Sequence, residues 1–381
     1  MNIFVEAHTI LKNRSGVGWY TYGLSRALQA RLGDGDNLYL LTHPREPIDL
    51  GELPDHDQTI EKPIDWMPAR LYHALKFRNL MPPMDLIYGN GLYLFPNFIR
   101  WPLVHSPSVI FIHDLSMFVC PEYSSPANLT FMRRHLENSV RRANVIAAVS
   151  EYSKQVLCEH FDIDPNNVVV AYPAVDHSHY RPRTADEIAA VQAKYGVFGK
   201  YMLFVSNLEP RKNVEGIIAA YRQLPAKLRA EVSLVLIGGR AWQDEPIHAA
   251  IAAARLAGDR VIQPGYVDEA DLPAFYAGAE LSVYPSHYEG FGIPVLESMA
   301  CGTPVITADN SSLPEVGGKA VTYVPSTDTK ALTHAMQELL TKPALRDKFK
   351  KAGLSQAQKF TWDKTAATLL TSLAEHGLLG S

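Results

Sequence analysis

Two series of short apolar segments, separated by helical stretches, constrain the fold more than any other feature of this sequence. The first series comprises Ile3–Ala7, Leu38–Thr42, Leu86–Tyr88, Val109–His113, Val145–Val149 and Val168–Tyr172. The second comprises Tyr201–Ser206, Val232–Gly238, Arg260–Gln263, Leu281–Tyr284, Val305–Thr307 and Val321–Val324. These runs are β-branched or aromatic and do not alternate with polar residues, which is typical of parallel sheets covered by helices on both faces. The sequence therefore predicts an α/β protein with two doubly wound, Rossmann-like domains.

The chain length agrees with two domains, because 381 residues are too many for one ordinary core. A polar stretch with a proline, Asp176–Thr184, is the expected linker. We therefore expect an N-terminal domain over residues 1–180 and a C-terminal domain over 181–359. Ligands of open α/β sheets bind at the carboxyl ends of the strands, so candidate site residues are sought there.

Composition narrows the class of partner. The chain is 47% hydrophobic and 20% charged with a net charge of −4, which is ordinary for a globular protein and does not favour a nucleic-acid partner. Its three cysteines, Cys120, Cys158 and Cys301, are far apart and form no CxxC pair. They indicate a reducing compartment. We see no signal peptide and no long apolar run, so the expected location is the cytoplasm.

The stretch from residue 284 to 302 carries the strongest chemical signal. A strand ending at Tyr284 is followed by a loop with Gly290 and Gly292, and then by a helix with Pro294 in its first turn and Gly302 at its C-terminal cap. Such a helix start presents N–H groups and a positive dipole end to an anion or to sugar hydroxyls. Two carboxylates flank it: Glu289 in the loop, and Glu297, expected in the first helical turn.

The segment Glu289-Gly-Phe-Gly-Ile-Pro-Val-Leu-Glu297 resembles the E-x7-E signature of retaining GT-B glycosyltransferases, specifically glycosyltransferase family 4. The stretches Cys301-Gly-Thr-Pro-Val-Ile-Thr, Ser312-Leu-Pro-Glu-Val-Gly and Asn207-Leu-Glu-Pro-Arg-Lys-Asn are similar to that family as well. The resemblance implies an acceptor-binding N-terminal domain and a C-terminal domain that binds the nucleotide sugar. It also implies that a last helix, at about residues 360–381, packs back on the first domain.

Arg211 and Lys212 follow the strand Tyr201–Ser206, where they would meet a ligand at the sheet edge. A diphosphate leaving group needs cations where its charge develops, and Arg and Lys supply a bidentate fork and a point charge. The resemblance assigns this role to both, and a catalytic role toward the transferred sugar to Glu289. It implies that the remaining donor contacts are Val267, Gly290, Phe291, Gly292, Ile293 and Glu297.

Gly16 and Gly18 follow the first strand and are preceded by Arg14-Ser15. A dinucleotide fingerprint would need a third glycine at position 21, which is Thr21, so that interpretation fails. Two interpretations remain: a glycine loop that approaches a phosphate or a sugar, and a simple tight turn. The resemblance favours the first and places the loop against the donor diphosphate and the acceptor.

His113 and Asp114 lie at the end of the strand Val109–His113. A lone histidine is often structural, but the family commonly has a histidine near the donor sugar here, which implies a catalytic role. Asp114 would orient the imidazole. No serine or cysteine with a matched base indicates a catalytic triad.

The segment Asp34-Gly-Asp36 could be mistaken for the D-x-D metal motif of other glycosyltransferases. It lies in a polar turn with nothing nearby to complete a site, so we expect no metal. The cation pair would replace Mg²⁺, and no cofactor is expected besides the nucleotide-sugar donor.

Arg70 to Leu80 mixes basic and aromatic residues at helical spacing, and Arg133-Arg134 and Arg141-Arg142 add charge. This pattern fits either a solvated helix face or a patch that meets an anionic membrane surface at the inner face of the cell membrane.

Together these features predict a retaining hexosyltransferase similar to bacterial polysaccharide mannosyltransferases. The expected donor is GDP-mannose or a GDP-deoxyhexose, and the expected acceptor is a saccharide hydroxyl on a growing, lipid-linked polysaccharide such as O-antigen. Alternatives are a UDP-sugar-dependent enzyme, an epimerase or phosphorylase of the same fold, and a non-catalytic nucleotide-sugar-binding subunit.

Overall fold

The computed structural model describes residues 1–10, 15–43 and 59–379 and divides into two compact units. Unit 1 consists of Met1–Pro121, Ser125–Ala174 and Thr361–Ser381, and unit 2 of Glu122–Ser124 and Val175–Phe360. The division between the units therefore falls after Ala174, a few residues before the linker region expected from the sequence.

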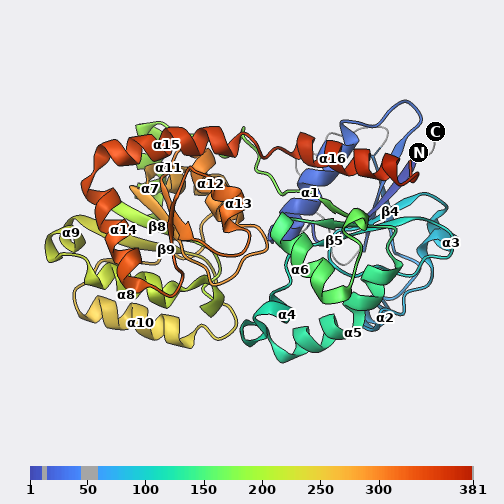
Figure 1. Cartoon of the computed structure of the whole chain (residues 1–381), viewed down its shortest axis with the longest axis horizontal. Helices are drawn as coiled ribbons and strands as arrows, with labels where there is room; N and C mark the ends of the chain where they lie inside the picture. Colours follow the sequence, from blue (N-terminus) through green and yellow to red (C-terminus); the bar gives the residue numbers. More distant parts are fainter. Residues whose placement is uncertain (11–14, 44–58, 380–381) are drawn as a thin grey trace. The chain divides into compact units, whose positions relative to one another are not determined.

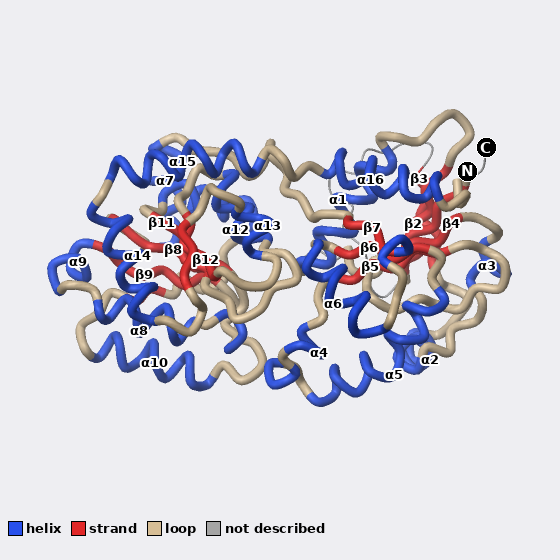
Figure 2. The backbone as a smooth tube through the Cα atoms, viewed as in Figure 1, coloured by secondary structure: helices blue, strands red, loops and turns tan. Residues whose placement is uncertain are grey.

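Unit 1 is built on a seven-stranded parallel sheet of order β3-β2-β1-β4-β5-β6-β7. The chain adds β2 and β3 on one side of β1 and then continues with β4 on the other side, so the strand order reverses between β1 and β4. Its strands are β1 (Asn2–Glu6), β2 (Asn37–Thr42), β3 (Thr59–Pro63), β4 (Leu92–Phe95), β5 (Ser108–Ile112), β6 (Val145–Ala148) and β7 (Val168–Val170) (Figures 1 and 2).

Seven helices accompany this sheet within the described part of unit 1: α1 (Gly16–Gln29), α2 (Ala69–Arg78), α3 (Met84–Tyr88), α4 (Ser116–Val119), α5 (Pro126–Arg142), α6 (Glu151–Phe161) and α16 (Trp362–Glu375). The 3-10 turn η2 (Pro165–Asn167) also belongs to this unit, whereas η1 (Pro121–Tyr123) spans the division between the units at residue 121. The C-terminal helix α16 packs on α1 and β7. Its Trp362 ring contacts Tyr20 edge to face at 5.4 Å and lies so close to Gly23 that any larger residue there would clash.

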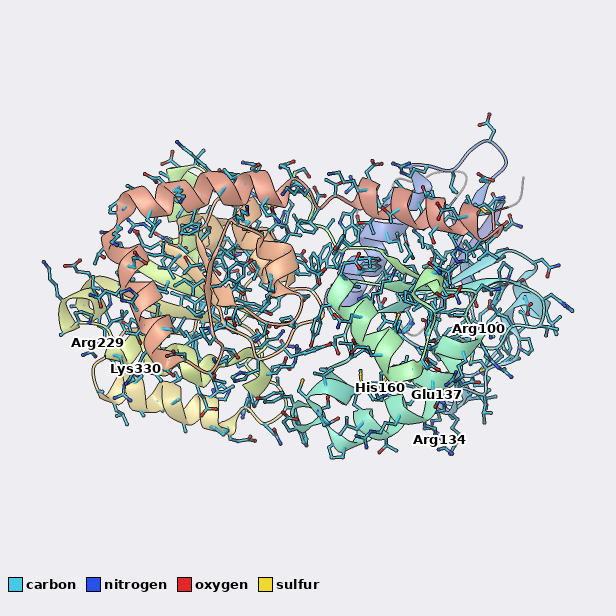
Figure 3. The ribbon with its side chains drawn as sticks, in the orientation of Figure 1. Arg100, Arg134, Glu137, His160, Arg229 and Lys330 are labelled. Carbon is cyan, nitrogen blue, oxygen red and sulfur yellow. The ribbon has the colours of Figure 1, made fainter. Side chains whose placement is uncertain are left out.

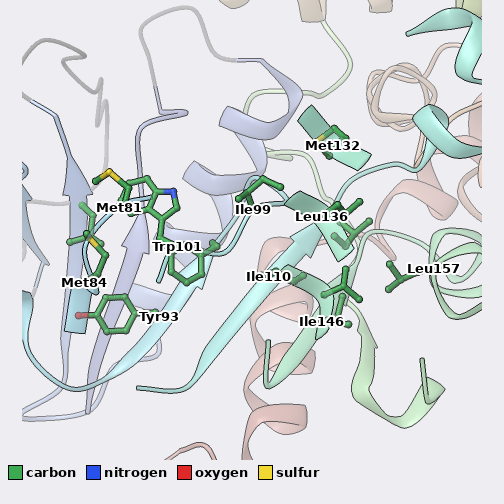
Figure 4. Packing of buried hydrophobic residues seen from close by; sticks show 14 of the residues in the cluster. Met81, Met84, Tyr93, Ile99, Trp101, Ile110, Met132, Leu136, Ile146 and Leu157 are labelled. Atoms are coloured by element: carbon green, nitrogen blue, oxygen red, sulfur yellow. The ribbon is translucent and has the colours of Figure 1, made fainter. Parts of the chain in front are cut away.

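One large hydrophobic cluster of unit 1 lies between one face of the sheet and the helices that cover that face. Trp101 and Tyr93 pack with Met81 and Met84, while Ile110 and Ile146 from the strands meet Leu136 of α5 and Leu157 of α6 (Figure 4). Burial of these side chains is the main favourable contribution to folding.

One predicted strand is wrong, because Leu86–Tyr88 belongs to the short helix α3. Pro83 is the N-cap of this helix, and Leu86 and Ile87 face solvent, so the apolar run is not a buried strand. The carboxylate of Asp85 accepts hydrogen bonds from the N–H groups of residues 104 to 106, which ties α3 to the next loop. The strands β3 and β4 were not predicted; β3 is an edge strand of mostly polar residues.

Unit 2 has a six-stranded parallel sheet of order β10-β9-β8-β11-β12-β13. Its strands are β8 (Lys200–Val205), β9 (Val232–Ile237), β10 (Val261–Ile262), β11 (Leu281–Tyr284), β12 (Val305–Ala308) and β13 (Thr322–Val324). Its helices are α7 (Ala185–Tyr195), α8 (Val214–Gln223), α9 (Ala226–Glu231), α10 (Glu245–Leu256), α11 (Leu272–Gly278), α12 (Ile293–Ala300), α13 (Leu313–Gly317), α14 (Thr329–Thr341) and α15 (Pro343–Ala357), with 3-10 turns η3 (Pro210–Lys212) and η4 (Glu269–Asp271).

The helices of unit 2 lie on both faces of its sheet. The helix α11 contacts α7 and α12, and α12 contacts α15, whereas α8 contacts α10 and α14 (Figure 1). Both units are thus Rossmann-like, and the predicted fold class of two doubly wound domains is confirmed. Within the described residues, no helix is both long and apolar enough to cross a membrane.

Candidate functional site

In the sheet of unit 2, the chain adds β9 and β10 on one side of β8 and β11 to β13 on the other, so the strand order reverses between β8 and β11. The segments after these two strands meet at the carboxyl edge of the sheet. The turn η3 follows β8 and carries Arg211 and Lys212, and the loop after β11 carries Glu289. A backbone hydrogen bond from the His287 N–H to the Arg211 carbonyl, at 2.9 Å, joins the two segments. The topology therefore brings three of the predicted site residues together.

Lys212 is the centre of this cluster and is only 7% exposed. Its ammonium donates to Glu289 Oε1 at 2.7 Å and to the Tyr284 hydroxyl at 2.9 Å. Glu289 is equally buried, at 6% exposure. Burial of an ion pair in this way is favourable only when its geometry and hydrogen bonds are good, which these short contacts provide.

Arg211 forms the second half of the cation pair. Its Nη1 donates to the Tyr288 carbonyl at 2.8 Å and to Glu289 Oε2 at 3.4 Å, and its Nη2 donates to Glu209 Oε1 at 2.7 Å. Glu289 thus contacts one cation through each carboxylate oxygen. The cluster contains two cations and two carboxylates, so its formal charges balance before any ligand is present.

The pKa values reflect this pairing. Burial by itself raises the pKa of Glu289, but the charges of Lys212 and Arg211 outweigh it and lower that pKa to about 2. Burial lowers the pKa of Lys212, and the Glu289 carboxylate more than compensates, so the pKa of the ammonium is raised. Both residues are therefore charged at neutral pH.

The loop that carries Glu289 is held in place by two serines. The N–H of Glu289 donates to Ser311 Oγ at 3.1 Å, and Ser312 Oγ donates to the carbonyls of Glu289 and Phe291 at 2.9 and 2.8 Å. The loop ends at Gly292, the N-cap of α12, whose φ of 114° is in the region that favours glycine. A Cβ there would also lie 2.8 Å from Leu313 Cδ2.

The helix α12 begins at Ile293, so Glu297 lies in its second turn and not in the first turn as predicted. Gly292 in its left-handed conformation is the N-cap, and Pro294 lies in the first turn as predicted. Glu297 Oε2 accepts a hydrogen bond of 2.6 Å from the hydroxyl of Tyr276, a buried residue of α11. Burial raises the pKa of Glu297, opposed by its hydrogen bonds from Tyr276 and Tyr180.

Val267 lies buried in the segment between β10 and η4, next to the exposed Tyr266. An ionic anchor follows it: the ammonium of Lys194 in α7 lies 2.7 Å from both Asp268 Oδ2 and Asp271 Oδ2. These contacts fix the segment against α7.

In unit 1, Gly16 and Gly18 were predicted to lie in a glycine loop or a tight turn. They form the first turn of the helix α1 instead. Ser15 is the N-cap, and its Oγ accepts from the Gly18 N–H at 3.3 Å, so that amide already has a partner. Gly16 is exposed, and a Cβ added to it would meet no atom within 4 Å. Arg14 lies outside the described residues.

His113 directly follows β5, and the structure assigns its imidazole a different partner from the one predicted. Its Nε2 lies 2.6 Å from the Pro96 carbonyl. Burial lowers the pKa of His113, so the ring is neutral with its proton on Nε2, because a carbonyl can only accept. The carboxylate of Asp114 instead accepts from the N–H and hydroxyl of Ser116, at 3.0 and 2.7 Å, at the start of α4.

Asp36 of the D-x-D-like segment also has a local structural role. Its Oδ2 accepts from the Gly33 N–H at 3.0 Å, and its Oδ1 pairs with the N-terminal ammonium of Met1. The interpretation of this segment as a turn agrees with these contacts.

Several residues that contact the predicted site residues were missed by reasoning from the sequence. Glu209 lies two residues before Arg211 in a quoted motif, so its spacing could have identified it as a partner. Tyr284 closes a strand and Tyr276 lies in a helix, and both carry no signal beyond their apolar neighbours. Tyr180 lies in the region interpreted as a linker.

Comparison with known proteins agrees with this architecture. The model of the family "Glycosyltransferase Family 4" matches residues 14–179, and that of "Glycosyl transferases group 1" matches residues 193–356. Among solved structures, the chain is similar to a sucrose-phosphate synthase from Thermosynechococcus elongatus, with a TM-score of 0.75 and 22% identity over 98% of both chains. A likeness at this identity shows the fold.

Two relatives from Escherichia coli are similar in sequence. The O-antigen chain mannosyltransferase B is 35% identical over 277 residues, which are 72% of this chain and 72% of the relative. The serotype-specific mannosyltransferase WbdA is 31% identical over 264 residues, 68% of this chain but only 32% of that longer relative. Together with the two family models, these matches show that the chain belongs to glycosyltransferase family 4, the group 1 glycosyl transferases.

Proposed function

We propose that this protein is a retaining, metal-independent mannosyltransferase that uses GDP-mannose or a GDP-deoxyhexose. Its acceptor would be a saccharide hydroxyl of a growing, lipid-linked polysaccharide of the O-antigen kind. The similarity to the E. coli O-antigen chain mannosyltransferase supports the sugar and the acceptor class. In this proposal unit 2 binds the donor, and unit 1 contributes to binding of the acceptor.

The observation that carries the proposal is the buried cluster of Lys212, Arg211 and Glu289. Two cations at the carboxyl edge, beside the N-terminus of α12, can stabilise the charge that develops on a departing nucleoside diphosphate. Because Glu289 and Glu209 hold both side chains before the substrate arrives, little reorganisation is needed when the charge appears. The same pair would serve in place of Mg²⁺.

The state of Glu289 favours retention without a covalent sugar–enzyme intermediate. A carboxylate whose pKa is held near 2, with a cation on each oxygen, is a weak nucleophile and a weak base. Double displacement needs a free carboxylate close to the anomeric carbon. We therefore propose that the departing diphosphate accepts the proton of the acceptor hydroxyl on the same face of the sugar, while Glu289 orients the cations and the transferred sugar.

Product analysis tests this function directly. The purified chain is incubated with a panel of GDP- and UDP-sugars and mannose-containing oligosaccharides, and products are identified by mass spectrometry and by NMR of the anomeric configuration. We expect transfer from a GDP-sugar with retained configuration and full activity in EDTA. Transfer from UDP-sugars alone would contradict the GDP-linked donor, and an inverted anomeric configuration would contradict retention. Loss of activity in EDTA that Mg²⁺ restores would contradict metal independence.

Substitution of Glu297 and of Glu289 should change different steady-state kinetic parameters. Glu297 would bind the ribose hydroxyls before and during the reaction, so Glu297→Gln should raise the donor KM more than it lowers kcat. Glu289→Gln should lower kcat more than it raises the donor KM, because the carboxylate acts on the transferred sugar and on the two cations that meet the charge developing on the diphosphate. The reverse pattern would exchange the two assignments.

The surface of unit 1 supports the proposed contact with an anionic membrane. The helix α2 exposes Arg70 and Arg78 together with Leu71, and Leu80 follows it. In α5, Arg133, Arg134, Arg141 and Arg142 are exposed, and Arg134 points away from the helix (Figure 3). Exposed basic and apolar side chains together are typical of interfacial binding. Binding to phosphatidylglycerol vesicles should weaken with salt, and equal binding to neutral vesicles would contradict the contact.

A further inference from the structure

The loop between β9 and α10, residues 238–244, has a construction that the proposed donor site does not explain. Trp242 is 47% exposed in this loop. Large aromatic side chains are usually well buried, so an exposed tryptophan beside a candidate active site is informative. Tryptophan and arginine are also the residues most enriched at the energetic centres of binding sites.

The loop is rigidly held although its tip is exposed. Asp244 is only 2% exposed, and its carboxylate accepts from Arg240 Nε and Nη2, both at 3.0 Å, and from the Ala241 N–H at 3.2 Å. His248 Nε2 lies 3.2 Å from the same carboxylate. Gln243 adopts a left-handed φ of 58°, a conformation that non-glycine residues rarely take unless their surroundings impose it. Trp242 and Arg240 are therefore presented in a fixed arrangement.

The loop lies beside the turn that carries the cation pair. A parallel bridge between Leu208 and Arg240 extends the pairing of β8 and β9 beyond the strands, and the Leu208 N–H donates to the Gly239 carbonyl at 2.9 Å. Gly238 permits this approach, because a Cβ there would lie 1.8 Å from the Ser206 carbonyl oxygen.

The position of the loop within unit 2 indicates which substrate it meets. The expected nucleoside contacts, Glu297 and Val267, belong to α12 and to the segment that leads into α11. The Trp242 loop leads instead into α10, which packs on α8, not on α11 or α12 (Figure 1). In the sheet, β9 lies on the side of β8 away from β11 and its Glu289 loop. The Trp242 loop therefore leads to the helices on the face of the sheet opposite to α11 and α12, and the turn with the cation pair separates it from the Glu289 loop.

The chemistry of the loop suits a pyranose. One face of a pyranose presents C–H bonds, which pack on the negative face of an indole ring. A guanidinium has five N–H donors, and Arg240 is exposed while two of them bond Asp244, so it can also donate to the hydroxyls of a sugar. We propose that Trp242 and Arg240 form a binding subsite for a pyranose of the acceptor saccharide, positioned by Asp244. This subsite deepens the proposed function and rests on it for the identity of the acceptor.

Kinetics of Trp242→Ala test the subsite, with GDP-mannose as donor and α-linked mannotetraose as acceptor. We expect the acceptor KM to rise about tenfold or more, as for loss of a tryptophan anchor, and the donor KM to stay within about twofold. Trp242→Phe, which keeps a smaller ring, should give an intermediate rise. Phe198→Ala is the matched control, because Phe198 is 63% exposed but precedes β8 at the amino edge of the same sheet.

Saturation-transfer NMR with mannotetraose gives a second measurement that does not require turnover. The signal should be present for the wild type and the Phe198→Ala variant and be lost in Trp242→Ala. If the wild type transfers no sugar but this pattern is found, the proposed function fails and the subsite stands. If transfer occurs but Trp242→Ala leaves the acceptor KM unchanged, or raises only the donor KM, the subsite is wrong and the function stands.

Discussion

Lys212 should stabilise the fold through Glu289 and the reaction through its charge, and a double-mutant cycle can separate the two effects. The perturbation is Lys212→Met, which keeps most of the side-chain length but leaves the 6% exposed Glu289 carboxylate without its 2.7 Å partner. Removing one member of a buried ion pair costs about 3–5 kcal/mol. Arg211 Nη1 still lies 3.4 Å from Glu289 Oε2, so we expect the lower end, about 3 kcal/mol.

The second variant, Lys212→Met/Glu289→Gln, removes both charges together. Replacement of a whole buried pair by neutral groups is often close to neutral for stability, so the double variant should recover most of the lost stability. Arg211 keeps its bonds to Glu209 and to the Tyr288 carbonyl. The catalytic activity of the double variant should not recover, because the departing diphosphate still lacks the charge of Lys212. Loss of one such group lowers kcat by about 10²–10³-fold.

Thermal unfolding and steady-state kinetics measure the two effects. For a domain of 150–250 residues each kcal/mol shifts the midpoint by about 2–4 °C, so Lys212→Met should lower one transition by roughly 6–12 °C. If the double variant loses as much stability as Lys212→Met and Glu289→Gln together, the two side chains do not interact energetically. That result would contradict the buried ion pair seen in the structure. Recovery of turnover in the double variant would refute the role of Lys212 at the diphosphate.

Three further predictions follow from the same structure. The pKa of Glu289 is about 2, below its ordinary value of 4.5, so its charge contributes stability that is present above pH 4.5 and lost as pH falls toward 2; Glu289→Gln should flatten that part of the pH–stability curve, and an unchanged curve would contradict the pairing. Burial lowers the pKa of His113, so its imidazole should be neutral with its proton on Nε2 at neutral pH, and ¹⁵N NMR showing an Nδ1–H tautomer would refute the bond to Pro96. Gly292→Ala should destabilise unit 2 by about 1–3 kcal/mol, and Gly16→Ala should leave the melting temperature unchanged. Gly16→Ala should lower turnover only if a substrate approaches that backbone. Equal melting temperatures for both variants would contradict the left-handed N-cap.

The sequence by itself determined the fold class and most of the strands. Buried parallel strands are continuous apolar runs, so β11 was found with its correct bounds, Leu281–Tyr284, and β8, β9 and β12 within a residue or two. The same rule failed where an apolar run was not buried, as in α3, and where an edge strand was polar, as in β3. Periodicity reports burial, and only the tertiary structure decides which short runs are buried.

The sequence also predicted Arg211, Lys212 and Glu289 as site residues, because a family motif surrounds each of them. It did not reveal that the three side chains form one ion cluster. Glu289 lies more than seventy positions after Arg211 and Lys212, and its contact with them depends on the order of β8 and β11 in the sheet. Local signals were likewise misassigned where a distant group competes for the same atom, as the Pro96 carbonyl does for His113.

Residue types and their spacing along the chain thus determined which groups are available for chemistry. The tertiary structure decided which of them are partners, because hydrogen bonds and ion pairs depend on distances that sheet order and burial establish. Trp242 shows the same division: the sequence contains it without a motif, and only the anchored loop at the carboxyl edge makes its exposure meaningful.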